Sequence, residues 1–182
     1  VRAGITEIMI VVSGPHAGDF IRVVKNGKEL GVKHLEYAYQ EKPDGGIADA
    51  LSLAEDFADN KPITVLLGDN TTDADISEPV KNFEDGAVVF LKKVPDPQRF
   101  GVPRFNPNDP KKIIEIIEKP KKPPSDYAVT GLYIYDSKVF DYIRQCKPSW
   151  RNELEITDVN NFYINAGKLK WACLLYTSDA AD

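Results

Sequence analysis

The fold of this chain is decided by the stretch Ile63-Thr-Val-Leu-Leu-Gly-Asp-Asn70. It is an apolar, β-branched run that begins after Pro62 and ends at Gly68, which predicts a strand buried on both faces of a sheet. Asp69 follows at once, and open parallel sheets bind ligands outside the carboxyl ends of their strands. The Asp69 carboxylate is therefore a candidate to hold a hard cation against phosphate groups. Taken alone, the same residues are more typical of an ordinary turn.

The composition excludes several classes of protein. With 182 residues the chain suits one domain with a sizeable core. Its formal net charge is -5 and its lysines and arginines are not clustered, which argues against a nucleic-acid surface. No apolar stretch approaches the roughly 20 residues of a membrane span, so no membrane partner is expected. Cys146 and Cys173 are the only cysteines, which excludes a disulfide framework or cysteine-built zinc site and suits a reducing cytoplasm.

Strand and helix patterns alternate around the central stretch. Apolar or alternating runs predict further strands at residues 7–13, 35–39, 87–93, 113–118 and 128–135. Apolar residues at helical spacing predict helices at residues 19–24, 47–57, 138–146 and 156–166. This order predicts an α/β protein whose sheet is largely parallel, with an inserted antiparallel portion.

Three local patterns each allow two interpretations. The turn at residues 43–46 opens a helix and could present backbone N–H groups to an anion or a base edge, but its residues are common in turns. Asp73 and Asp75 form a D-x-D pair, which can chelate a divalent ion or lie in a solvated turn. Gly131, inside an alternating strand, marks a bulge or a close approach to the backbone.

Six segments, in this order and with this spacing, resemble the sugar-phosphate nucleotidyltransferase family from Val1 to about Trp171. They are Tyr39-Gln-Glu-Lys-Pro-Asp-Gly45, Leu67-Gly-Asp-Asn70, Arg99-Phe-Gly-Val102, Ile117-Glu-Lys-Pro120, Ala128-Val-Thr-Gly-Leu-Tyr133 and Glu153-Leu-Glu-Ile-Thr-Asp-Val159. The resemblance implies a Rossmann-like, GT-A-like fold with a mixed, mainly parallel sheet flanked by helices. It assigns residues 1–172 to a partial catalytic domain.

The resemblance also implies a nucleotide site with a metal. Gln40 resembles the residue whose amide pairs with a thymine edge, because an amide offers a donor and an acceptor together. Pro43 and Gly45 would line the base. Asp69 resembles the family's magnesium ligand and counts as catalytic, since Mg²⁺ prefers one or two carboxylates together with phosphate oxygens.

A sugar-phosphate site is implied beside it. Gly101 resembles the glycine whose backbone meets the sugar hydroxyls, Glu118 the carboxylate that accepts from them, and Val129 a backbone contact on the sugar. Lys119 and Arg151 resemble the catalytic cations that hold the sugar phosphate.

The implied reaction is nucleotidyl transfer from dTTP to glucose 1-phosphate, with dTDP-glucose and pyrophosphate as products. The implied setting is a cytoplasmic homo-oligomer, a tetramer in many family members, with Mg²⁺ as cofactor. Two alternatives stay open. One is a glycosyltransferase that uses Asp73 and Asp75 to hold a nucleotide sugar, and the other is a non-catalytic nucleotide-sugar sensor.

Both ends of the sequence are expected to be incomplete. In the resembled family a glycine-rich phosphate-binding signature would precede Val1, and a second magnesium carboxylate would follow Ala172. We therefore expect the 182-residue polypeptide itself to be nearly inactive. Residues 173–182 can be back-translated into a string that resembles the transposon mosaic-end adapter of sequencing libraries. Our hypothesis is that this tail is translated adapter, which an authentic genomic copy continuing with the same residues would refute.

Overall fold

The computed structural model describes residues 1–15, 17–70 and 72–174. Most of the predicted adapter tail, residues 175–182, lies outside this description. Within it, no helix is both long and apolar enough to cross a lipid bilayer.

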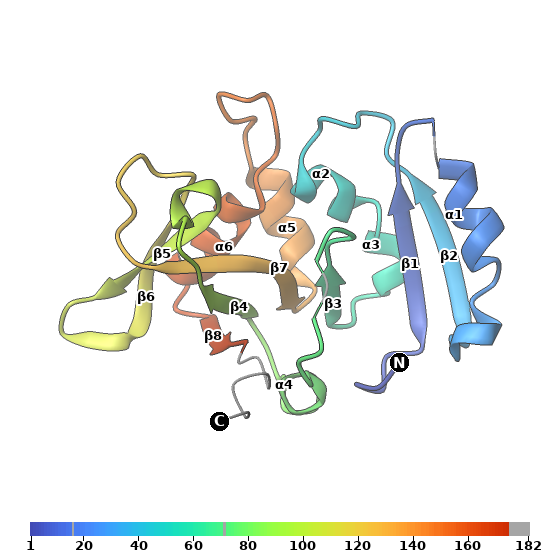
Figure 1. Cartoon of the computed structure of the whole chain (residues 1–182), viewed down its shortest axis with the longest axis horizontal. Coiled ribbons are helices and arrows are strands. Elements are labelled where there is room, and N and C mark those ends of the chain that lie inside the picture. The colour runs from blue at the N-terminus through green and yellow to red at the C-terminus, as the bar shows by residue number, and fades with distance from the viewer. Residues whose placement is uncertain (16, 71, 175–182) are drawn as a thin grey trace.

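The chain alternates strands and helices in its first half and is rich in strands in its second (Figure 1). The strands are β1 (Glu7–Val12), β2 (His34–Tyr39), β3 (Ile63–Leu66), β4 (Ala87–Lys93), β5 (Gly101–Asn106), β6 (Asp109–Glu118), β7 (Tyr127–Tyr135) and β8 (Leu169–Cys173). The α-helices are α1 (Ala17–Val24), α2 (Ile47–Ser52), α3 (Glu55–Ala58), α4 (Ser77–Lys81), α5 (Lys138–Gln145) and α6 (Ile156–Asn165). The 3₁₀ turns η1 (Lys28–Leu30) and η2 (Pro97–Arg99) lie between them.

The strands form a parallel pair, a mixed sheet and a hairpin. β1 pairs in parallel with β2, and the four-stranded sheet has the order β3-β7-β4-β8. In that sheet β4 and β8 run parallel, while β7 is antiparallel to both of its neighbours. β5 and β6 form an antiparallel hairpin around the turn after Asn106, which agrees with the expected antiparallel portion. The mixed α/β class with flanking helices is thus confirmed, but the parallel share is smaller than expected.

The central stretch forms a strand, as predicted, but this strand is not buried on both faces. β3 pairs antiparallel with β7 and lies at the edge of its sheet, so solvent reaches it from the unpaired side. Ile63, Thr64 and Val65 are half-buried, and Leu66 is 57% exposed. The β1 strand is likewise half-buried between the exposed Glu7 and the buried Val12, since β2 is its one strand partner in the described part of the chain.

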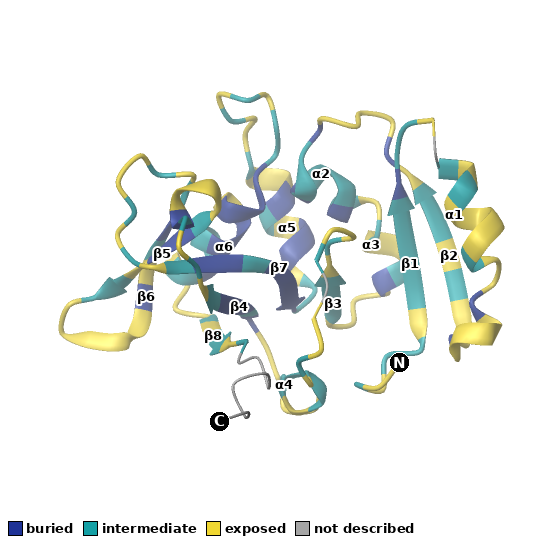
Figure 2. Ribbon diagram, viewed as in Figure 1, coloured by how far each residue is buried: buried dark blue, intermediate teal, exposed yellow. Residues whose placement is uncertain are grey.

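The hydrophobic core lies between the four-stranded sheet and the helices α5 and α6 (Figure 2). Tyr135 and Tyr163 are its largest fully buried side chains. Phe90 forms a separate, smaller cluster with Leu132 and Ile134. The predicted helical face of α6 is confirmed at Ile156, Val159 and Tyr163, whereas Ala166 lies beyond the end of the helix and is exposed.

The helix expected over residues 47–57 is broken into α2 and α3. The Ser52 hydroxyl donates a 2.6 Å hydrogen bond to the carbonyl oxygen of Asp49, three residues earlier. Such a bond competes with helical pairing and favours a helix end, which the apolar periodicity does not reveal.

Candidate functional site

The loop that carries Asp69 is tied to the central strand β7. Leu67 N–H donates to the carbonyl oxygen of Gly131 at 2.8 Å, and Gly131 N–H donates to Asn70 Oδ1 at 3.0 Å. A Cβ atom at Gly131 would lie 2.5 Å from Asn70 Nδ2, so this contact requires glycine. The expected close approach at Gly131 is therefore confirmed, and the pairing of β4 with β7 also shifts register here. Asp69 itself stays exposed, with Oδ1 accepting a 2.7 Å bond from Asn70.

Gln40 lies at the carboxyl end of the parallel pair β1–β2. Its backbone N–H donates to the carbonyl oxygen of Val12 at 2.8 Å, and its side chain is buried. The side-chain Nε2 donates to Asp49 Oδ2 at 2.8 Å and to the carbonyl oxygen of Gly46 at 3.2 Å. Both N–H groups of the amide are thus engaged within the protein. The resemblance implies that this amide offers both a donor and an acceptor to a base. In the structure only the acceptor, Oε1, is left for a ligand.

The glycine-rich turn after Gln40 is clamped to the segment before α6. Leu154 N–H donates to the carbonyl oxygen of Gly45 at 2.8 Å, and Ala48 N–H donates to the carbonyl oxygen of Leu154 at 3.1 Å. Gly46 between them has φ +93°, and a Cβ atom there would lie 2.5 Å from the Leu154 oxygen. Figure 1 shows the loop before α2 and the loop between α5 and α6 on the same side of the molecule.

This clamp encloses an open pocket of about 300 Å³. Its walls come from the glycine-rich turn, from α2, from the end of β3 and from the segment before α6. They are Gln40, Pro43, Asp44, Gly46, Ile47, Ala50, Leu67 and Glu153. The predicted base-binding residues Gln40 and Pro43 therefore share one pocket with Leu67, two positions before Asp69.

Arg151 is surrounded by three carboxylates. Its Nε and Nη2 donate to Glu155 at 2.9–3.2 Å, and Nη2 lies 3.0 Å from Glu153 Oε2 and 3.8 Å from Glu118 Oε1. Glu155 is buried and also accepts a 2.7 Å bond from the Ser149 hydroxyl. The hydrogen bonds donated to Glu155 and the neighbouring negative charges raise the pKa of the Arg151 guanidinium. Its Nη1 bonds to no acceptor within the described residues.

Glu118 is held from its other side by α6. The Thr157 hydroxyl donates to Glu118 Oε2 at 2.6 Å, and Gly101 pairs with Glu118 across the hairpin. A Cβ atom at Gly101 would lie 3.3 Å from Thr157 Oγ1 and 3.5 Å from Glu118 Oε2, so glycine leaves room for this bond. Lys119 follows with φ 44°, a left-handed conformation that costs a lysine about 1–2 kcal/mol.

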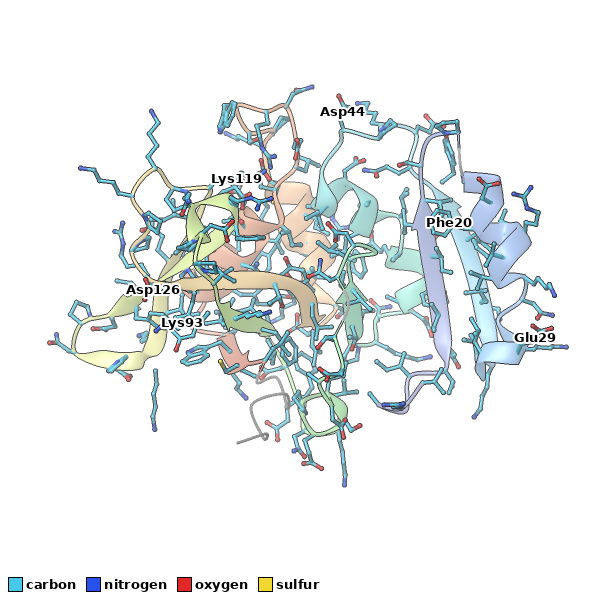
Figure 3. The ribbon with its side chains drawn as sticks, in the orientation of Figure 1. Phe20, Glu29, Asp44, Lys93, Lys119 and Asp126 are labelled. Atoms are coloured by element: carbon cyan, nitrogen blue, oxygen red, sulfur yellow. The ribbon has the colours of Figure 1, made fainter. Side chains whose placement is uncertain are left out.

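The negative charges of two predicted acidic site residues act on the same buried phenol. Burial, together with the negative charges of Glu118 and Asp69, raises the pKa of Tyr133 well above its usual value. Figure 3 places Lys119 and Asp44 on the upper side of the molecule, where the clamped loops lie. Glu153 lines the pocket and also lies 3.0 Å from Arg151 Nη2, so the pocket and the ion cluster adjoin each other. The predicted residues at positions 40, 43, 45, 69, 119 and 151 belong to loops, and Gly101 and Glu118 lie at strand ends.

The position of Val129 does not connect it with the other predicted site residues. It is buried in β7 opposite Leu91, and β3 covers β7 only from Leu132 onward. Its proposed backbone contact with a sugar stays a prediction.

The Asp69 carboxylate fits a magnesium ion that is shared with phosphates. It is exposed and forms no ion pair with a described lysine or arginine. No group of three or more acidic, histidine or cysteine side chains among the described residues could enclose a metal. Mg²⁺ keeps few protein ligands and completes its shell with water and phosphate oxygens, so a single exposed carboxylate is a suitable donor.

The D-x-D pair lies in the loop between β3 and α4. Asp75 Oδ1 accepts a 2.8 Å bond from Ser77 N–H, and hydrogen bonds from Ser77 lower the pKa of the Asp75 carboxyl. This is the arrangement of a turn at a helix start, which favours the turn interpretation over a chelating pair.

Four supporting residues were not singled out from the sequence: Asp49, Asn70, Glu155 and Thr157. Asn70, Glu155 and Thr157 lie within quoted segments, which is the one signal that could have found them. Asp49 lies in the first turn of α2, and no sequence pattern indicates a role for it in the site.

A sequence profile of the family described as "Nucleotidyl transferase" matches residues 1–178. The glucose-1-phosphate thymidylyltransferase of Xanthomonas campestris pv. campestris (strain B100) is 43% identical over 171 residues, covering 92% of this chain and 57% of its own length. That of Neisseria meningitidis serogroup A is 39% identical, covering 92% of this chain and 58% of its own length. The chain thus spans less than two thirds of the length of these relatives.

A solved structure is similar over nearly the whole chain. It is the crystal structure of a proposed glucose-1-phosphate thymidylyltransferase from Bacillus anthracis in complex with sucrose. It is 48% identical, with a TM-score of 0.86, and the match covers 96% of this chain and 70% of that one.

We expect the clamp at Gly46 to be intolerant of a side chain. G46A should lower the free energy of unfolding by about 2–4 kcal/mol, because a Cβ atom at positive φ meets backbone atoms of Leu154. Urea unfolding followed by circular dichroism measures the change. The control is G4A, since Gly4 has φ +83° with no atom within 4 Å, and it should cost about 1–2 kcal/mol. Equal losses in the two variants would contradict the clamp.

The carboxylates around Arg151 should contribute unequally. E155Q should destabilise the chain by about 1–3 kcal/mol, because Glu155 is buried and bonds both Arg151 and Ser149. E153Q removes the same charge from a more exposed partner and should cost less than about 1 kcal/mol. Thermal and urea unfolding of both variants measures the difference, and a larger loss for E153Q would refute this ranking.

Proposed function

The chain belongs to the nucleotidyl transferase family, and from this premise we propose that its site transfers a thymidylyl group from dTTP to glucose 1-phosphate. The products are dTDP-glucose and pyrophosphate. The observation that carries the proposal is the convergence of three parts, since Leu67 of the Asp69 loop lines the Gln40 pocket and so does Glu153 of the Glu118–Arg151 cluster. The glucose-1-phosphate thymidylyltransferases that align with 92% of this chain support the choice of substrates.

The nucleotide is proposed to enter with its base in the pocket beside Gln40. Pro43 and Ile47 provide apolar walls for the base. Gln40 Nε2 is bonded within the protein, which leaves Oε1 as the side-chain atom that would face the base. Leu67 lies in the same pocket, so the triphosphate would extend from there toward Asp69. The base and the phosphates are thereby held at a fixed separation.

The sugar phosphate is proposed to bind between Lys119 and Arg151. Glu155 fixes the guanidinium through Nε and Nη2, so that Nη1 remains to donate to a phosphate oxygen. The Lys119 ammonium is exposed and is paired with no described acidic side chain. Glu118 is anchored by Thr157 through Oε2, which leaves Oε1 to accept from a sugar hydroxyl.

Catalysis would consist of positioning and charge neutralisation. A phosphate oxygen of glucose 1-phosphate attacks the α-phosphorus of dTTP, and the bond from that phosphorus to the pyrophosphate oxygen breaks. No general base is needed, since the attacking phosphate is already ionised near neutral pH. Lys119 and Arg151 offset the repulsion between the two anions and align them, and Asp69 would hold Mg²⁺. When bound, that ion neutralises phosphate charge as a Lewis acid.

Replacement of Asp69 should remove most of the activity of the complete gene product. D69N should lower kcat/KM on the order of a hundredfold or more, because it removes the carboxylate that holds the cation. Pyrophosphate release from dTTP with glucose 1-phosphate is the measurement. D73N is the control, and it should keep nearly full activity. If D73N abolished turnover and D69N did not, the result would support the glycosyltransferase alternative and contradict our proposal.

The Lys119 charge should act on the sugar phosphate rather than on the nucleotide. K119Q should raise KM for glucose 1-phosphate by about 10–100-fold, the scale of one hydrogen bond to a charged group, with a smaller effect on KM for dTTP. The matched control is K122Q in the same exposed loop. A predominant effect on KM for dTTP would assign Lys119 to the triphosphate instead.

A further inference from the structure

The orientation of the Gln40 amide is determined by what surrounds it. Nitrogen and oxygen of an amide are exchanged by a half-turn, so the neighbours must decide which is which. Nε2 faces Asp49 Oδ2 at 2.8 Å and the Gly46 carbonyl oxygen at 3.2 Å. A carboxylate and a carbonyl can only accept hydrogen bonds, and Oε1 in that place would face two acceptors. The NH₂ group therefore points inward and the carbonyl oxygen outward.

Asp49 contacts the Gln40 amide but does not line the pocket. Gln40 lines the pocket of about 300 Å³, whereas Asp49 is absent from its walls. Asp49 is half-buried on α2, and the Gly45 turn packs against its carboxylate. No donor among the described residues is bonded to Gln40 Oε1. Of the two polar atoms in the Gln40 side chain, the one left for a ligand in the pocket is thus the acceptor Oε1.

We propose that Asp49 is a positioning residue which fixes the Gln40 amide with its carbonyl oxygen toward the base, so that the site selects pyrimidines with an N–H at position 3. This inference rests on the proposed function and deepens it. Thymine and uracil carry a hydrogen on N3 and can donate it to Gln40 Oε1. Cytosine has a bare N3, and its lone pair would face the Gln40 oxygen. Two acceptors in contact leave both unpaired, which polar sites penalise strongly.

Replacement of Asp49 by asparagine tests this directly. The side-chain amide that D49N introduces could donate to Gln40 Oε1, which would let the Gln40 amide turn and present N–H groups to the base. In the complete gene product, D49N should lower the ratio of kcat/KM for dTTP over dCTP about tenfold, the scale of one amide hydrogen bond. The dTTP over UTP ratio should stay within about twofold, since both bases carry the N3 hydrogen. Both ratios are independent of the fraction of enzyme that is folded.

Two further variants separate positioning from general structure. D56N removes the same charge from an exposed aspartate on α3 and should leave the dTTP over dCTP ratio unchanged. In a Q40A background, D49N should change that ratio by less than about twofold, because Asp49 acts through Gln40. An undiminished effect in that background would overturn the inference.

The remaining outcomes are decisive as well. An unchanged dTTP over dCTP ratio in D49N, or an equal loss of turnover with both nucleotides, would overturn the role of Asp49 while the proposed function stands. A wild-type protein that turns over no pyrimidine triphosphate with a sugar phosphate would overturn the proposed function, and this inference with it.

Discussion

The ion cluster around Arg151 is the interaction on which the arrangement of the site depends. It joins the end of the β5–β6 hairpin, through Glu118, to the segment before α6, through Glu153 and Glu155. Three carboxylates near one guanidinium would repel each other without it, and Glu155 is buried. A buried charge is tolerated when it is paired and hydrogen-bonded, as Glu155 is by Arg151 and Ser149. The same contacts fix a cation where an anionic substrate would bind.

The segment before α6 also reaches the nucleotide side of the site. Leu154 pairs with Gly45 and Ala48, so one short stretch is bonded to both proposed substrate sites. A transfer between two anions needs them held at a fixed distance, because a small misplacement of reacting atoms is costly in rate. The backbone hydrogen bonds of Leu154 with Gly45 and Ala48 provide such a fixed connection, and Gly46 between them has no side chain to displace Leu154.

Local sequence patterns predicted which segments form helices and strands better than they predicted which segments pack or pair with each other. Apolar runs identified β4, β7 and the second half of β6. The central stretch was identified as a strand, but an apolar run does not encode that β7 is its antiparallel neighbour, so its burial was overestimated. The roles of Asp49 and Thr157 depend on partners nine and 39 residues away, which no local spacing reveals. The resemblance between motifs supplied the candidate site residues, and the tertiary contacts explain how these side chains are held.

The most direct test of this account is a crystal structure of the complete gene product with dTTP and Mn²⁺. Manganese accepts the same carboxylate and phosphate oxygens as magnesium and can be located by its anomalous scattering. We predict a manganese peak at the Asp69 carboxylate, the thymine ring in the pocket beside Gln40, and N3 within hydrogen-bonding distance of Oε1. A triphosphate bound on another face, with no manganese at Asp69, would contradict the account.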